Sequence, residues 1–256
     1  MVKFIPCPAR RMMLLFCTFI FGCSGLGPQT DPVLSSRAMA VSLKAKAQNQ
    51  SIKSSKGIGN VKIHTRGHTR TFKIAWAATQ RNQIRITFLL SGHPVETIIS
   101  NGAAIEFYSH TGAHKKHIVF SRNPNLKKYL GICLKLSEIV QILLGRLPIE
   151  NFDDAYFKPA DPKQLTVILT KKFRPFSQQI VLGKKQNIVQ LHSLDNLGNI
   201  NYSMHLSNRK MIDSNPVPHK IHIIDQKNNR LVLKIISFSP NPLLKAHVFQ
   251  LTESGS

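Results

Sequence analysis

Acidic residues are scarce in this chain: 12 Asp and Glu stand against 35 Lys and Arg, which gives a formal net charge of +23. A surface of this kind attracts anionic partners. Aromatic residues are also few, at 7% of 256 residues, and they are not interleaved with the basic ones as in proteins that stack nucleic-acid bases. Charged residues make up only 18% and hydrophobic ones 42%, which excludes wholesale disorder.

The N-terminal apolar run is too short to cross a bilayer. A span needs about 20 residues, and the run from Met12 to Phe21 has about ten. Basic residues precede it at Lys3, Arg10 and Arg11. A basic segment followed by a short apolar run is typical of a signal peptide. An uncleaved membrane anchor is the alternative, and it too would place the domain outside the cytoplasm.

The apolar run ends in Gly22-Cys23, which resembles the bacterial lipobox, where the cysteine is acylated and becomes the mature N-terminus. We therefore expect a lipoprotein signal peptide over residues 1–22, and a lipidated Cys23 with its tether over residues 23–30. Ser24, and not Asp, follows the cysteine. This favours a lipid-anchored protein in the outer membrane, facing the periplasm.

Cysteine is rare, and export would leave little of it. Of Cys7, Cys17, Cys23 and Cys133, cleavage removes two and lipidation uses a third. Cys133 alone cannot form an intramolecular disulfide or a cysteine zinc site, so the core must stabilise the domain. Because an exported lipoprotein seldom meets nucleic acid, we expect anionic lipid or lipopolysaccharide, and no nucleic acid, to be the partner of the basic residues.

Motifs for catalysis and for metal binding are lacking. There is no Gly-x-Ser-x-Gly sequence and no glycine-rich phosphate loop. The neighbours Asp153 and Asp154 fall in a predicted loop, and Cys133 lies between apolar residues, which favours an inert thiol. Histidines cluster in turn segments, where glycines interrupt any helical spacing of metal ligands: His64, His68, His110, His114 and His117. We expect no catalytic residue, no metal site and no cofactor.

What the sequence does have is alternation of apolar and polar residues. Period-two runs bounded by turn residues recur about every ten residues from Gly57 onward. They are centred on 61–63, 72–76, 84–90, 95–99, 105–107, 118–120, 165–169, 180–182, 189–191, 200–206, 221–223, 231–235 and 249–251. The alternation predicts antiparallel strands with one buried and one wet face.

Two helices are predicted among these strands. Asp31-Pro32 is a favourable start for a helix of about 15 residues that places Leu34, Ala38, Val41 and Ala45 on one face. A strongly apolar helix is predicted over 136–147, with Ser137 at its start and Gly145 near its end. A loop is predicted over 150–163. We expect residues 31–256 to form one mainly β domain with a single curved sheet.

Four segments resemble the lipoprotein carrier superfamily, which includes the periplasmic carrier LolA and the outer-membrane receptor LolB. They are GIGNVKIHTRG (57–67), IRITFLLSGHPVETIISNGAAIEFY (84–108), LSEIVQILLGRLP (136–148) and PHKIHIIDQKNNRLVLKIISFSPNPLLKAHVFQL (218–251), and the resemblance covers about 200 residues. The last segment is similar to that family's closing hairpin followed by a short final strand. The resemblance implies an unclosed half-barrel of about eleven antiparallel strands, with the N-terminal and central helices covering the concave face.

The resemblance further implies that the apolar concavity holds acyl chains. The candidate lipid-binding residues are the inward-facing residues of two strands and the apolar face of the central helix: Phe72, Ile74, Trp76, Ile84, Ile86, Phe88, Leu136, Ile139, Val140 and Leu143. The family's receptors carry an exposed leucine in the loop that corresponds to the hairpin at Ser91-Gly92. Alternation predicts that Leu90 faces the core and Leu89 the solvent, so Leu89 and Leu90 are the candidate membrane-insertion residues, with Leu89 the exposed one.

Two functions remain open. The first is an outer-membrane lipoprotein that binds the acyl chains of lipoproteins or lipids in the half-barrel and passes them to the inner leaflet of the outer membrane. The second is a non-catalytic envelope assembly or structural lipoprotein that uses the same fold as a protein-binding surface. A sheet interior packed without a cavity would favour the second.

The lipobox makes a direct prediction. We expect Cys23→Ala to abolish incorporation of a radiolabelled fatty acid and to release the protein from the membrane fraction, because the acylated thiol is lost. Labelling equal to that of the wild type would exclude Cys23 as the modified residue.

Overall fold

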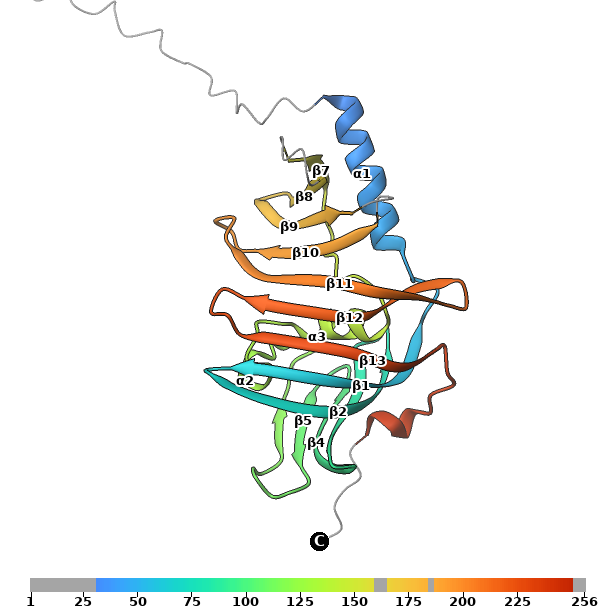
Figure 1. The fold of residues 1–256 in the computed structure, drawn as a ribbon, viewed down its shortest axis with the longest axis vertical. Coiled ribbons are helices and arrows are strands. Elements are labelled where there is room, and N and C mark those ends of the chain that lie inside the picture. The colour runs from blue at the N-terminus through green and yellow to red at the C-terminus, as the bar shows by residue number, and fades with distance from the viewer. Residues whose placement is uncertain (1–30, 159–164, 184–186, 251–256) are drawn as a thin grey trace, which may run out of the picture. The chain divides into compact units, whose positions relative to one another are not determined.

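The computed structural model describes residues 31–158, 165–183 and 187–250, and its main feature is one open sheet of thirteen antiparallel strands (Figure 1). The strand order is β6-β5-β4-β3-β2-β1-β13-β12-β11-β10-β9-β8-β7. The strands are β1 (Ser54–Thr65), β2 (His68–Thr79), β3 (Gln83–Leu90), β4 (His93–Asn101), β5 (Ile105–Ser109), β6 (His117–Val119), β7 (Asp154–Phe157), β8 (Leu165–Lys171), β9 (Arg174–Leu182), β10 (Ile188–Leu194), β11 (Ile200–Ile212), β12 (Asn215–Asp225) and β13 (Arg230–Pro240). The prediction of a mainly β chain with one unclosed antiparallel sheet is confirmed.

The sheet consists of two meanders joined at one place. Strands β1–β6 and β7–β13 each pair in sequence order, and the pair β1–β13 connects the two sets. Several strands are linked by tight turns of the kind that suits twisted hairpins. Arg66 and Gly67 both have positive φ angles, of 51° and 79°, and Ser91 and Gly92 follow the same pattern with 50° and 86°.

Two parts of the strand prediction are wrong. The predicted loop 150–163 contains β7, whose one fully buried residue, Ala155, leaves almost no apolar alternation to detect. The predicted strand around Phe249 is instead the 3-10 helix η2 (Ala246–Phe249). Because β13 already pairs with β12 and β1, the sheet has no free edge there. Phe249 is buried, and Val248 accepts a hydrogen bond from Arg85 of β3.

Helix α1 (Pro32–Ala47) packs against β7 and β8, at one end of the sheet (Figure 1). It buries only a narrow stripe of small residues, Ala38, Ser42 and Ala45. Leu34, predicted on the buried face, is 47% exposed because it lies in the first turn of the helix. Ser35 Oγ donates to the carbonyl of Ala155 at 3.4 Å, which fixes α1 to β7.

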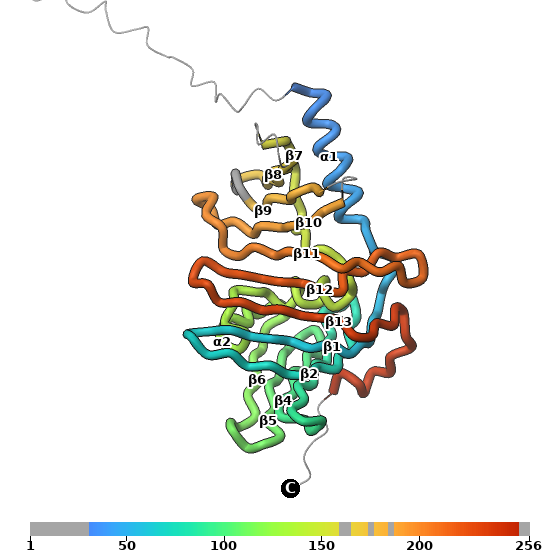
Figure 2. The backbone as a smooth tube through the Cα atoms, in the orientation of Figure 1, coloured from blue at the N-terminus to red at the C-terminus, as the bar shows by residue number. Residues whose placement is uncertain are grey.

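The chain between β6 and β7 crosses one face of the sheet, behind β11–β13 in the view of Figures 1 and 2. It contains α2 (Lys127–Leu130) and α3 (Leu136–Leu143). We call residues 126–149 the cover. Helix α3 ends four residues earlier than predicted, since Gly145 takes a left-handed φ of 70°. Its N-cap is Lys135 and not Ser137, because the Glu138 carboxylate accepts the backbone N–H of Lys135 at 2.6 Å.

Two charged side chains of the cover are buried. The guanidinium of Arg146 donates to the carbonyl oxygens of Asn49, Gln50 and Ile52, and burial lowers its pKa. The carboxylate of Glu138 accepts a hydrogen bond of 2.6 Å from Tyr202 Oη on β11. Burial raises the pKa of Glu138, and the bonds from Tyr202 and Lys135 oppose that shift. These contacts hold the cover against the sheet.

The bond between Tyr202 and Glu138 gives a stability prediction. We expect Tyr202→Phe to lower the free energy of unfolding by about 1.5–3 kcal/mol, the contribution of a hydrogen bond to a charged group. Urea denaturation measures the change. Tyr156→Phe, which removes a half-buried hydroxyl on β7, is the matched control and should change stability by less than about 0.5 kcal/mol. Equal losses in the two variants would contradict a special role for this bond.

Candidate functional site

An apolar cavity of about 60 Å³ lies between the sheet and the cover. No polar atom contributes to its exposed lining. The lining residues come from β1, β2, β3, β4, β12 and β13 on the sheet side and from α2, α3 and their connection on the cover side: Val61, Ile63, Ile74, Ile86, Phe88, Ile98, Leu126, Leu130, Leu134, Ile139, Ile142, Leu143, Ile221, Ile223, Leu231 and Leu233.

The structure separates the candidate lipid-binding residues into two groups. Five of them line the cavity: Ile74, Ile86, Phe88, Ile139 and Leu143. The other five lie in the surrounding core: Phe72, Trp76, Ile84, Leu136 and Val140.

Trp76 illustrates the second group. It is only 4% exposed and donates to Ser55 Oγ at 3.2 Å. A Cβ on Gly57 would approach its ring within 2.2 Å, so this glycine is needed for the tryptophan to lie flat on β1. Phe72 is half-buried and packs edge-on against Phe88, with ring centroids 5.7 Å apart. Both aromatic rings thus support the wall of the cavity from outside its lining.

Sequence reasoning missed the contribution of α2 to the cavity. Leu126, Leu130 and Leu134 line it, but α2 is a single turn and gives no helical periodicity to detect. Most of the sheet residues that were missed, such as Val61 and Ile223, have the same alternating pattern as those that were selected. The same alternation rule, applied to every predicted strand and not to two of them, would have identified these residues.

The cavity is too small for an acyl chain as it stands. Its volume is far below the roughly 300–1,000 Å³ that is typical of ligand pockets. An acyl chain can therefore enter the cavity only when the cover moves. The cover is held by the Glu138–Tyr202 bond and by Ser55 Oγ, which donates to the carbonyl of Leu143 at 2.7 Å.

The hairpin at Ser91-Gly92 corrects one expectation. Leu90 is 55% exposed, whereas Leu89 is half-buried and pairs with Lys73 on β2. Leu90 keeps the inward phase of Phe88, but the cavity lining ends at Phe88 and nothing covers the strand beyond it. A register shift between Phe88 and Leu89 places Leu90 opposite His93. The exposed leucine of this hairpin is Leu90.

A basic groove of about 1260 Å³ adjoins the cover. Its walls are the β1–β2 turn, α2 and the β12–β13 turn, and its cations are Arg66, Arg70, Lys127, Lys128 and Lys227. The adjacent lysines Lys127 and Lys128 both contribute to it. Lys171/Lys172 lie at the β8–β9 turn instead, and Lys116 pairs with Glu106 at 3.3 Å.

The histidines of the turns have local partners. His64 Nδ1 lies 2.8 Å from Thr69 Oγ1, His110 Nε2 lies 2.8 Å from Thr97 Oγ1, and His114 Nε2 lies 3.6 Å from Glu96 Oε1. Within the described ranges, no group of three or more His, Cys, Asp or Glu side chains is placed to hold a metal ion. Cys133 is half-buried rather than fully buried, and its sulfur accepts from Asn125 Nδ2 at 2.8 Å.

Residues 1–30, which include the predicted signal peptide, Cys23 and the tether, lie outside the described residues. In the part of the chain that is described, no helix combines the length and the apolar character needed to cross a membrane.

Comparison with known proteins gives matches at the level of structure. No family model and no curated protein matches the sequence. A DUF1329 family protein from Desulfovibrio piger superposes with a TM-score of 0.58 at 10% identity, covering 85% of this chain and 97% of its own. A putative outer membrane lipoprotein-sorting protein domain from Vibrio parahaemolyticus gives 0.57 at 12% identity, covering 84% and 96%.

A LolA superfamily protein from Nitrosomonas europaea gives a TM-score of 0.56 at 11% identity, covering 84% of this chain and 97% of its own. Identities this low establish the fold and nothing finer. The three superpositions nevertheless span nearly the whole length of each solved structure. This chain has the fold of these solved structures, one of which is a LolA superfamily protein, as the resemblance of its sequence segments implied.

Proposed function

We propose that this protein is a non-catalytic carrier or acceptor that binds acyl chains of lipoproteins or lipids between its sheet and its cover. The observation that carries the proposal is the wholly apolar cavity, since sixteen side chains from six strands and the cover surround it without a polar group. Two structural neighbours, a putative outer membrane lipoprotein-sorting protein domain and a LolA superfamily protein, support the same function.

In this proposal the cavity between the sheet and the cover widens to take acyl chains. Each methylene group that leaves water contributes about 0.8 kcal/mol, so a few acyl chains can bind firmly without any charged contact. The chains would displace part of the cover, because the present cavity cannot hold them. The Glu138–Tyr202 and Ser55–Leu143 bonds are those that opening would break.

The setting that we propose is the inner leaflet of the outer membrane. Acylated Cys23 would anchor the protein there through the tether, and the domain would face the periplasm. Anionic lipids or lipopolysaccharide would attract the basic surface. Leu90, at the tip of the β3–β4 hairpin, would enter the bilayer during delivery.

The small volume of the cavity also supports the alternative function. A sheet interior this well filled is suited to a rigid scaffold, which would serve envelope assembly through its outer surface and bind no lipid. Acyl-chain binding therefore separates the two functions.

Trp76 provides the readout for acyl-chain binding. We expect brominated acyl chains to quench Trp76 emission in a saturable way, because the only tryptophan of the chain lies buried beside the cavity wall. Fluorescence titration measures the quenching. Emission that stays constant at saturating lipid would contradict the carrier function and favour the scaffold.

Two variants of β3 make this test specific. Ile86→Phe fills the cavity and should weaken binding about 5- to 150-fold, because overpacking costs about 1–3 kcal/mol. Ile84→Phe is the matched control, since Ile84 is fully buried on the same face but does not line the cavity. Equal affinities in the two variants would mean that the chain binds elsewhere.

Delivery to the membrane gives a separate prediction. We expect Leu90→Asp to keep the free energy of unfolding within about 0.5 kcal/mol, because Leu90 is exposed. It should slow transfer of bound fluorescent lipid to vesicles about tenfold, since inserting one leucine contributes about 1.5–3 kcal/mol. Leu243→Asp, at a 95% exposed leucine before η2, is the control. Transfer at the wild-type rate in both variants would exclude the hairpin from delivery.

A further inference from the structure

The basic groove lies directly beside the apolar cavity. Three parts of the fold contribute to both sites. Ile63 on β1 and Arg70 on β2 are cross-strand partners and so share one face of the sheet, where Ile63 lines the cavity and Arg70 the groove. In the cover, Leu130 lines the cavity while Tyr129 and Gly131 line the groove, and beside the start of β13 Leu231 lines the cavity and Asn229 the groove. A molecule with an apolar and a polar part could therefore occupy both sites at once.

The walls of the groove are tied together. Gly131 ends α2 with a φ of 75°, and a Cβ at this position would come within 2.1 Å of Thr65 Cγ2, so α2 sits directly on the end of β1. Asn229 Nδ2 donates to the carbonyl of Gly131 at 3.3 Å, which connects the β12–β13 turn to the same point. The groove is thus a fixed feature of the fold, built from three elements far apart in sequence.

The lining of the groove carries positive charge and no negative charge. Five cations line it, and its lining contains no carboxylate. In the part of the chain that the structure describes, none of these five forms an ion pair. The nearby Asp225 accepts the backbone N–H of Lys227 and both the backbone and side-chain N–H groups of Asn229, at 2.8–2.9 Å. Its oxygens therefore already have donors.

We propose that this groove binds the phosphate headgroup of a phospholipid or phosphorylated glycolipid whose acyl chains enter the adjoining cavity. The inference rests on the proposed acyl-chain binding and names its ligand class: an anionic, phosphate-bearing lipid. Lysine and arginine are the groups that bind phosphate in proteins. A volume of about 1260 Å³ suits a bulky headgroup better than a single free phosphate ion.

Two lipids with the same acyl chains test the inference. The probes are dioctanoyl phosphatidic acid and uncharged dioctanoylglycerol, titrated calorimetrically into the purified chain. In Lys128→Gln/Lys227→Gln, one cation is lost from α2 and one from the β12–β13 turn. Each near-surface cation contributes about fivefold, so we expect the affinity for the phosphatidic acid to fall about 25-fold. The affinity for dioctanoylglycerol should stay within about twofold, because the cavity is unchanged.

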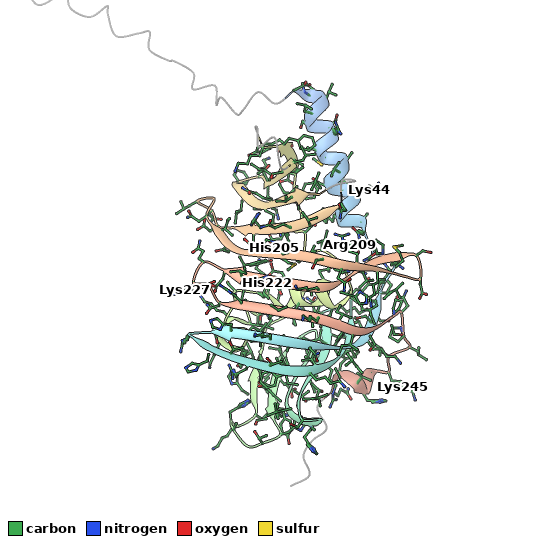
Figure 3. All side chains as sticks on the ribbon, viewed as in Figure 1. Lys44, His205, Arg209, His222, Lys227 and Lys245 are labelled. Atoms are coloured by element: carbon green, nitrogen blue, oxygen red, sulfur yellow. The ribbon has the colours of Figure 1, made fainter. Side chains whose placement is uncertain are left out.

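Lys44→Gln/Lys245→Gln is the matched control. It removes the same charge from one helical and one loop position, and both residues lie at the opposite ends of the strands from Lys227 in Figure 3. This variant should bind both lipids like the wild type. An equal loss in the control would mean that the net charge of the protein acts and the groove does not, which would overturn the inference.

The remaining outcomes are also decisive. Unchanged binding of phosphatidic acid by Lys128→Gln/Lys227→Gln, or equal loss for both lipids, would overturn the headgroup site while leaving the acyl-chain function intact. Displacement of phosphatidic acid by millimolar inorganic phosphate would identify the groove as a site for free phosphate. Binding of neither lipid by the wild type would overturn the proposed function itself.

Discussion

An open sheet with apolar side chains on its inner face needs another part of the chain to keep that face from water. In this protein the cover over residues 126–149 does so, and most of its side chains are buried. Both candidate sites exist because of this arrangement. The cavity is what remains between the cover and the sheet, and the basic groove forms where α2 meets the ends of β1 and β13.

The cover is held by polar as well as apolar contacts, and this sets it apart from an ordinary core. Glu138 and Arg146 are charged groups that lose much of their hydration, and each is compensated by specific hydrogen bonds. Breaking one partner leaves a buried charge without compensation, so such contacts favour one defined closed position over many similar ones. Apolar packing alone would allow α3 to slide along the sheet.

Local patterns in the sequence were sufficient for much of the fold. The alternation of Ile84, Ile86 and Phe88 predicted β3 and its buried face, and the apolar residues of 136–143 predicted α3.

The parts of the prediction that were wrong concern residues whose structure depends on contacts distant in the sequence. The four residues of β7 are ordered by pairing with β8 and packing against α1, and Phe249 is buried as part of η2 near β3 and β4. Leu90 shows the same limitation of the sequence pattern. Alternation predicts which face of the sheet a side chain lies on, but not whether another element covers it there. The groove combines turns at positions 66, 131 and 228, which no local pattern links.

The pairing of β1 with β13 has a consequence for how the chain folds. Residues about 165–185 positions apart, such as Ser55 and Pro240, are direct neighbours in this pair, which joins the two meanders into one sheet. Contacts this distant in sequence are made slowly, because a long loop must close first. Until β13 arrives, β1 presents an unpaired edge twelve residues long, the kind of edge that pairs with other chains. We therefore expect β1 to be open to pairing with other chains until β13 has been made.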